Sequence, residues 1–217
     1  MGLIDSHAHL TFDGLIERVD DVLARCREAG VDRVITVGTD LADARKAVAL
    51  AARFPEQVHP AVGFHPHEAD KVTNADLHAM ADLWRDPAVV AVGEIGLDYH
   101  YDLADRNVQR SVLVRQLEAA AEIDKPIIIH CREAFDDLIP CLLDHGYRSR
   151  PVVVHCFTGT VDQAARLTEY GWRISFTGIV TFKRSTTLQE IARSYPLDQL
   201  MVETDAPYLS PEPVRSR

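Results

Sequence analysis

The sequence predicts a (β/α)8 barrel, the TIM-barrel class of α/β fold, and two patterns favour it. Short apolar or β-branched runs alternate with longer segments of helical period along the 217 residues. Runs such as "PIIIH" and "PVVVH" are apolar throughout, as expected of parallel strands that are covered on both faces. A doubly wound open sheet is the alternative, but no GxGxxG turn follows the first predicted strand.

The predicted elements follow these two patterns in chain order. The apolar runs predict strands at residues 3–6, 33–37, 58–62, 89–93, 126–129, 151–154, 172–176 and 199–202. The helical periods predict helices at residues 15–29, 41–53, 74–85, 106–123, 134–143, 161–170 and 187–194. Thr160 and Gln163 form a capping box, and Gly30, Gly146 and Gly171 stand just past helix ends. No linker or low-complexity tract divides these elements, so we expect one domain over residues 1–217.

Composition limits the possible partners. The formal net charge of -10 works against broad attraction to a phosphate backbone, so a phosphate substrate would need a local cationic centre. No stretch approaches the roughly 18 consecutive apolar residues of a membrane span, and the N-terminus lacks the order of a secretory signal. We therefore expect a cytoplasmic protein with no membrane partner. The four cysteines have no CxxC spacing, and we expect them to be reduced.

Histidines and carboxylates stand at the carboxyl ends of five predicted strands. They are His7, His9, Glu94, His130, His155, Glu203 and Asp205. Because these strand ends converge on one face of a barrel, we expect the side chains to meet there. His7 and His9 are two residues apart and therefore point to the same side, whereas Cys131 and Cys156 follow histidines and should point outward. Without Glu203, the other six exceed the four ligands of a structural zinc site and suit two divalent ions that share a carboxylate.

The other histidines of the chain and one of the candidate carboxylates also fit ordinary structural roles. His59, His78, His100 and His145 fit surface or core positions, and we leave them out of the site. Asp205 precedes Ala-Pro, a common start of a turn, but the preceding strand directs it to the same face as the histidines.

Seven motifs in order over nearly the whole chain resemble the TatD family of metal-dependent deoxyribonucleases within the amidohydrolase superfamily. They are "DSHAHL", "GFHPHEA", "GEIGLDYH", "IIIHCREA", "VVVHCFTG", "ISFTGIVTFK" and "VETDAPYLSP". The resemblance implies a TIM barrel, two divalent metals (Mg, Mn or Zn) and hydrolysis of DNA phosphodiesters, with exonuclease-type activity in some members.

The resemblance also implies roles for individual residues. It makes His7, His9, Glu94 and Asp205 ligands of one metal, and Glu94 bridges to a second metal that His130 and His155 hold. It makes His65 a substrate or phosphate contact. Arg132, Lys183 and Glu203 are further candidates for contact with the phosphate, with ordinary salt bridges at the barrel rim as the alternative. The chain stops twelve residues after Asp205, where the family continues into a final helix. We therefore expect that helix to be missing and the outer faces of the last and first strands to be exposed.

The sequence therefore predicts a metal-dependent hydrolase that cleaves DNA phosphodiester bonds with a water activated by two metals, Glu94 and Asp205 being the catalytic carboxylates. Asp205 would also accept the proton of that water. The acidic balance and the small number of surface aromatics favour a short substrate, either a single-stranded DNA end or a small phosphodiester. We expect a monomer or weak oligomer. One alternative function is hydrolysis of an amide, lactone or aminoacyl ester at the same metal centre. A second alternative, which is not an enzyme, is an inactive metal-binding scaffold protein.

Overall fold

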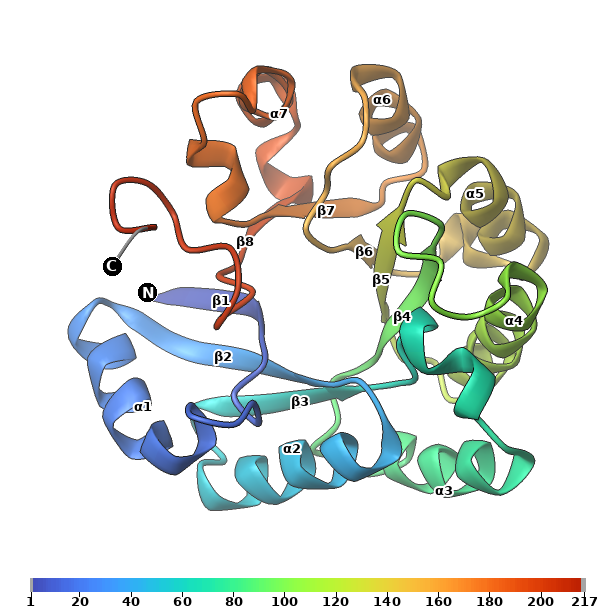
Figure 1. Cartoon of the computed structure of the whole chain (residues 1–217), viewed down its shortest axis with the longest axis horizontal. Coiled ribbons are helices and arrows are strands. Elements are labelled where there is room, and N and C mark those ends of the chain that lie inside the picture. Colours follow the sequence, from blue (N-terminus) through green and yellow to red (C-terminus); the bar gives the residue numbers. More distant parts are fainter. Residues whose placement is uncertain (1, 216–217) are drawn as a thin grey trace.

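The computed structural model describes residues 2–215 and confirms the predicted barrel. Eight parallel strands are hydrogen-bonded in sequence order: β1 (Leu3–Ala8), β2 (Val31–Gly38), β3 (Val58–Val62), β4 (Ala91–Asp98), β5 (Ile127–Arg132), β6 (Val152–Val154), β7 (Arg173–Phe176) and β8 (Leu200–Val202). Seven α-helices surround them in Figure 1: α1 (Val19–Glu28), α2 (Leu41–Arg53), α3 (Asn74–Trp84), α4 (Arg106–Glu122), α5 (Phe135–Asp144), α6 (Val161–Glu169) and α7 (Thr186–Ser194).

Residues 2–215 also form five 3-10 helices, of which only the first lies within a predicted helix, the one expected at residues 15–29. They are η1 (Ile16–Arg18), η2 (Pro66–Lys71), η3 (Tyr147–Ser149), η4 (Gly178–Thr181) and η5 (Leu197–Gln199). Two of them, η2 and η4, follow strands at the face where the candidate site lies, and η2 begins directly after His65.

The barrel closes between β1 and the segment that follows β8. The backbone N–H of Asp205 donates to the carbonyl of His7 at 2.9 Å, and the N–H of His9 donates to the carbonyl of Ala206 at 2.8 Å. These hydrogen bonds tie the last predicted ligand to the first two, because Asp205, His7 and His9 take part in them through their own backbones. Closure therefore places both ends of the predicted ligand set side by side.

Two layers of apolar side chains form the core. Ala61, Ala91 and Ile128 pack together inside the barrel. A larger cluster lies between the strands and the helices and includes Ile127 and Ile129. The alternation along β5 therefore directs Ile128 inward and its two neighbours outward, and it directs His130 to the same side as Ile128.

After β8, the described residues form turns up to residue 215, and no helix follows within residues 2–215. Leu3, Ile4 and Val202, on β1 and β8, are 59%, 47% and 49% exposed. The expected exposure of apolar side chains on these two strands is thus observed. Within the same residues, none of the helices is both long and apolar enough to cross a membrane.

Strand β4 is longer than predicted. The sequence predicts its end at Gly93, whereas the structure continues it to Asp98. The reason is close packing: a Cβ on Gly96 would overlap the carbonyl oxygen of His130, and its φ of +149° is one that side-chain-bearing residues rarely adopt. The glycines that would weaken an isolated strand here allow β4 to approach β5 beside His130.

Replacing Gly96 with alanine is expected to destabilise the fold by about 1–3 kcal/mol, because the added methyl must push β4 and β5 apart. Chemical denaturation measures this change. Gly14→Ala is the matched control, since Gly14 also has a positive φ of +88° but no atom within 4 Å of its added Cβ. If Gly96→Ala and Gly14→Ala lower the free energy of unfolding equally, the contact between Gly96 and His130 is not tight.

Candidate metal centre

Glu94 lies at the middle of a buried cluster of histidines. Its Oε1 is 2.7 Å from Nε2 of His155, 2.9 Å from Nδ1 of His130 and 3.4 Å from Nε2 of His65. Its Oε2 lies 3.4 Å from Nε2 of His7. Burial alone would raise the pKa of Glu94, but the surrounding histidines, His155 foremost, hold it well below its usual value. The carboxylate is therefore ionised, and its two oxygens face two different groups of side chains.

The first group joins β1 to the segment after β8. Oδ1 of Asp205 lies 3.3 Å from Nε2 of His9 and 3.7 Å from Nε2 of His7. Burial would lower the pKa of His9, but the hydrogen bond to Asp205 and the charge of Glu94 raise it instead. His7 and His9 thus point to the same side, as their spacing predicts, and Asp205 meets them there.

His7 shows that this group is suited to a metal ion. The side chain is completely buried, and neither of its ring nitrogens has a hydrogen-bond partner. Because a buried polar atom without a partner is costly, the unpartnered nitrogen beside two carboxylates fits a cation ligand. His7, His9 and Glu94 bring one ligand atom each within 4.8 Å of one another.

The second group consists of His130 and His155 around Oε1 of Glu94. Their facing nitrogens, Nδ1 of His130 and Nε2 of His155, are 3.4 Å apart. Although burial opposes it, the charge of Glu94 and a hydrogen bond to Glu203 raise the pKa of His155 well above its ordinary value. A divalent cation would take the place of the protons that pair these imidazoles with the carboxylates.

Asp98 supports the second group and was not identified from the sequence. It is fully buried, and its Oδ2 accepts hydrogen bonds from Nε2 of His130 at 3.0 Å and Nε2 of His67 at 2.9 Å. Its Oδ1 accepts the backbone N–H groups of His100 and Tyr101. Since Asp98 holds the Nε2–H of His130, the Nδ1 lone pair of that ring is directed at Glu94 and is free for a metal.

His65 is placed as a hydrogen-bond donor to the site rather than as a metal ligand. Its Nδ1 accepts the backbone N–H of His67 at 3.1 Å, so the neutral ring carries its proton on Nε2, which faces Glu94. Burial lowers the pKa of His65 to about 4, even though Glu94 opposes the shift. His65 can form a compact ligand group with Glu94 and His130, but a protonated Nε2 has no lone pair for a metal.

The other three predicted substrate contacts lie in different surroundings. Arg132 lines the pocket and places its guanidinium carbon 5.1 Å from the ring centre of Tyr101. Glu203 lies behind His155, where its Oε1 accepts the N–H of Cys156 at 2.7 Å and lies 3.4 Å from Nδ1 of His155. Lys183 is exposed after η4 and is not among the residues that line the pocket.

Both cysteines that were expected to point away from the site are among the residues that line the pocket, although Cys131 is the more deeply buried of the two. Cys131 packs in the core between strands and helices, where burial raises its pKa. Cys156 lines the pocket and lies 3.7 Å from Oγ1 of Thr177. Strand β6 ends at Val154, and Cys156 has a φ of +43°, so the alternation of a strand no longer applies there.

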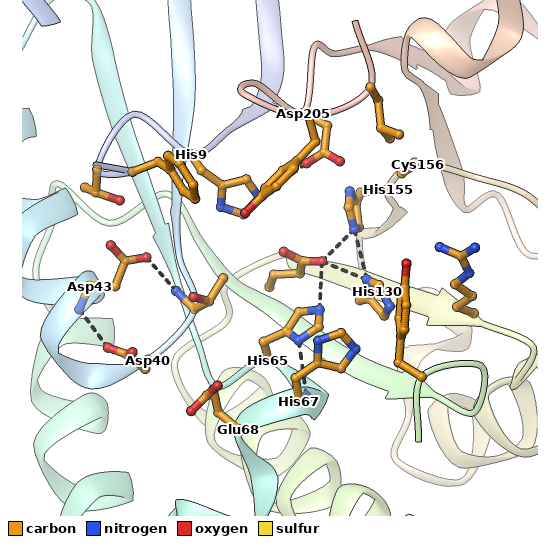
Figure 2. A pocket seen from close by; sticks show the side chains of 18 of the residues that line it. His9, Asp40, Asp43, His65, His67, Glu68, His130, His155, Cys156 and Asp205 are labelled. Carbon is orange, nitrogen blue, oxygen red and sulfur yellow. Dashed lines mark hydrogen bonds and ion pairs between the residues drawn. The ribbon is translucent and has the colours of Figure 1, made fainter. Parts of the chain in front are cut away.

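These groups open into one pocket of about 750 Å³ at the carboxyl ends of the strands. Figure 2 shows His9 and Asp205 on one side of it, across from His65 and His67, with His130 and His155 between the two sides. The volume is within the range of small-molecule sites, which is roughly 300–1,000 Å³. The arrangement brings a buried carboxylate, flanked by two imidazole groups, to the floor of a pocket open to substrate.

A TIM barrel with histidines and carboxylates converging at the carboxyl ends of its strands defines the class of metal-dependent hydrolases. The family model described as "TatD related DNase" matches residues 4–217, and the chain belongs to that family.

Curated relatives and solved structures agree with this assignment. The chain is 34% identical to the uncharacterized metal-dependent hydrolase YabD of Bacillus subtilis, over 99% of this chain and 84% of the relative. It is 36% identical to the 3'-5' ssDNA/RNA exonuclease TatD of Edwardsiella piscicida, over 99% of this chain and 83% of that relative. The crystal structure of YjjV, a TatD homologue from Escherichia coli, matches with a TM-score of 0.93 at 31% identity and covers 99% of this chain and 83% of that one.

Proposed function

We propose that this chain hydrolyses phosphodiester bonds of DNA and that it does so with two divalent cations. The observation that carries the proposal is the division of the Glu94 carboxylate between two ligand groups. Oε2 faces His7, which lies beside His9 and Asp205, and Oε1 faces His130 and His155. A carboxylate placed in this way is suited to bridge two ions, one in each group. The name of the Edwardsiella piscicida relative supports a nucleic acid as the substrate.

When bound, two such cations would polarise the phosphate and lower the pKa of a water molecule. The residues of the chain supply the rest. Oδ1 of Asp205, beside both His7 and His9, is placed to accept a proton from the attacking water. The Nε2–H of His65, which lies 3.4 Å from Oε1 of Glu94, would donate a hydrogen bond to a phosphate oxygen bound beside that carboxylate. Because four of the six ligands are imidazoles, Mn²⁺ or Zn²⁺ suits the centre better than Mg²⁺, which prefers oxygen ligands.

Hydrolysis assays with matched substrates test this proposal. The metal-free protein, reloaded with Mg²⁺, Mn²⁺ or Zn²⁺, is assayed on a single-stranded DNA oligonucleotide, on bis-p-nitrophenyl phosphate, and on simple esters and lactones. We expect turnover of both phosphodiesters with Mn²⁺ or Zn²⁺ and none after chelation. Faster turnover of the esters or lactones would assign the centre to carbonyl substrates. No turnover of any substrate with any of the three metals would favour an inactive metal-binding protein.

A further inference from the structure

The exposed aromatic side chains of the molecule gather at the pocket. Within residues 2–215, three aromatic side chains are exposed, namely Phe12 (43%), Tyr101 (54%) and Tyr208 (49%), and all three line the pocket. The other Phe, Tyr and Trp side chains in this part of the chain are buried or half-buried. Exposed rings at one site, on loops from distant parts of the sequence, call for a ligand with flat apolar faces.

The three rings lie on two sides of the metal centre. Tyr208 contacts His9, with ring centres 5.8 Å apart, and Phe12, with ring centres 5.7 Å apart. This pair therefore continues outward from the first ligand group, and the backbone N–H of Tyr208 is hydrogen-bonded to the carbonyl of Asp205 at 2.8 Å. The connection fixes the position of the ring relative to that ligand.

Tyr101 continues outward from the second ligand group in the same way. Its ring centre lies 5.5 Å from that of His67, edge to face, and the guanidinium carbon of Arg132 lies 5.1 Å from it. Its backbone N–H donates to Oδ1 of Asp98 at 2.8 Å, and the other oxygen of Asp98 accepts from His130. One buried carboxylate therefore fixes both the imidazole of the second group and the loop that carries Tyr101.

We infer that the two sides are stacking positions for two consecutive nucleobases of a single strand, with the phosphate between them at the metal centre. The inference rests on the proposed function and specifies its substrate. A phosphodiester carries one nucleoside on each side, and each side of this centre offers an aromatic face. Bases that stack on side chains must be unpaired, so a duplex interior is excluded. The cation of Arg132 beside Tyr101 adds attraction both to a base and to the phosphate backbone.

Charge at the rim limits how far a strand extends. Asp13, Asp40, Asp43 and Glu68 line the pocket beside the loops that follow β1, β2 and β3, and Figure 2 shows Asp40 and Asp43 at one edge of it. Lys46 of α2 also lines the pocket, but the four carboxylates outnumber it, so this edge carries net negative charge and repels a phosphate backbone that crosses it. The strand therefore leaves the centre on the side of Arg132, and the site engages a short segment rather than a long track.

Oligonucleotides with and without bases test the inference on the metal-loaded full chain. One single-stranded DNA carries all its bases, and a matched one carries abasic residues on both sides of the cleaved bond. We expect Tyr101→Ala and Tyr208→Ala each to raise KM for the complete oligonucleotide by roughly 5- to 100-fold, the effect of one lost base–aromatic stack. Neither variant should change KM for the abasic oligonucleotide, and Tyr101→Phe, which keeps the aromatic face, should retain the KM of the wild type.

Tyr170→Ala is the matched control, because Arg148 lies over the Tyr170 ring at 4.6 Å in a similar arrangement that is outside the pocket. If KM rises equally for the complete and the abasic oligonucleotide, the stacking inference is wrong and Tyr101 and Tyr208 have a structural role. The proposed phosphodiester hydrolysis would still stand in that case. Unchanged KM values in both variants would overturn it as well. If the wild-type protein cleaves neither oligonucleotide, the proposed function fails and the stacking inference fails with it.

Discussion

Replacing Glu94 with glutamine is expected to lower hydrolysis by roughly 1,000-fold or more and to reduce the number of bound divalent cations. The side chain is 4% exposed, and its two oxygens face His7 on one side and His155 and His130 on the other. Glutamine keeps the shape but replaces one oxygen with an NH2 group. Whichever way the amide turns, it directs N–H donors at one ligand group, where they oppose a cation. Metal analysis of the purified variant and initial rates on single-stranded DNA measure the two effects.

Glu118→Gln is the control for this substitution, since Glu118 is an exposed residue of α4 outside the pocket. It should retain the metal content and the rate of the wild-type protein. If Glu94→Gln binds as much metal as the wild type and remains fully active, the carboxylate does not bridge two ions and the two-metal proposal is wrong.

The fold and the six predicted ligands follow from periodicity and from strand ends. An apolar run that ends in a histidine predicts both a buried strand and the point where its carboxyl end reaches the barrel face. His130 and His155 satisfy this pattern, and the two-residue spacing of His7 and His9 predicts that they share a side. These predictions need only local sequence and one assumption, that the strands close into a barrel.

Glu94 was predicted, but the continuation of the strand beyond it was missed because the local pattern is misleading there. Gly93 and Gly96 resemble the end of a strand, yet in the barrel they are the residues that allow β4 to lie against β5. A Cβ on Gly93 would lie 2.6 Å from the carbonyl oxygen of Ile128. The strand therefore continues to Asp98, and neither Asp98 nor its partner His67 was identified, because their contacts depend on a strand that the sequence does not predict.

Glu203 illustrates a limit of the same kind at the other end of the chain. It is two residues from Asp205, so the alternation of a strand would place both carboxylates at the pocket. However, β8 ends at Val202, and Asp205 has a φ of +56°. The carboxylates diverge: Asp205 lines the pocket, and Glu203 accepts hydrogen bonds behind His155. The carboxylate of Glu203 thus lies 3.4 Å from Nδ1 of His155, and the site contact proposed for it from the sequence stays a prediction.

Replacing Asp98 with asparagine is expected to weaken binding at the His130–His155 group by roughly 10- to 100-fold, the usual effect of losing a carboxylate that orients a histidine ligand. Both carboxylate oxygens of Asp98 are acceptors: Oδ2 for the two imidazoles, and Oδ1 for two backbone N–H groups. Asparagine offers one acceptor oxygen, so its NH2 group must oppose either the imidazoles or the backbone. In one orientation of the amide the ring of His130 loses its acceptor, and in the other the backbone of the Tyr101 loop loses its acceptor.

Metal titration of the variant distinguishes this positioning role from a loss of fold. We expect one cation to bind as in the wild type and the second to bind more weakly, with hydrolysis recovering at high metal concentration. Asp86→Asn is the control, because the half-buried Asp86 accepts the N–H of Ala88 in the turn before β4 and does not line the pocket. Equal weakening of both cations would show that Asp98 supports the barrel as a whole. Unchanged binding of both would show that Glu94 and His155 hold the second ion without an oriented His130.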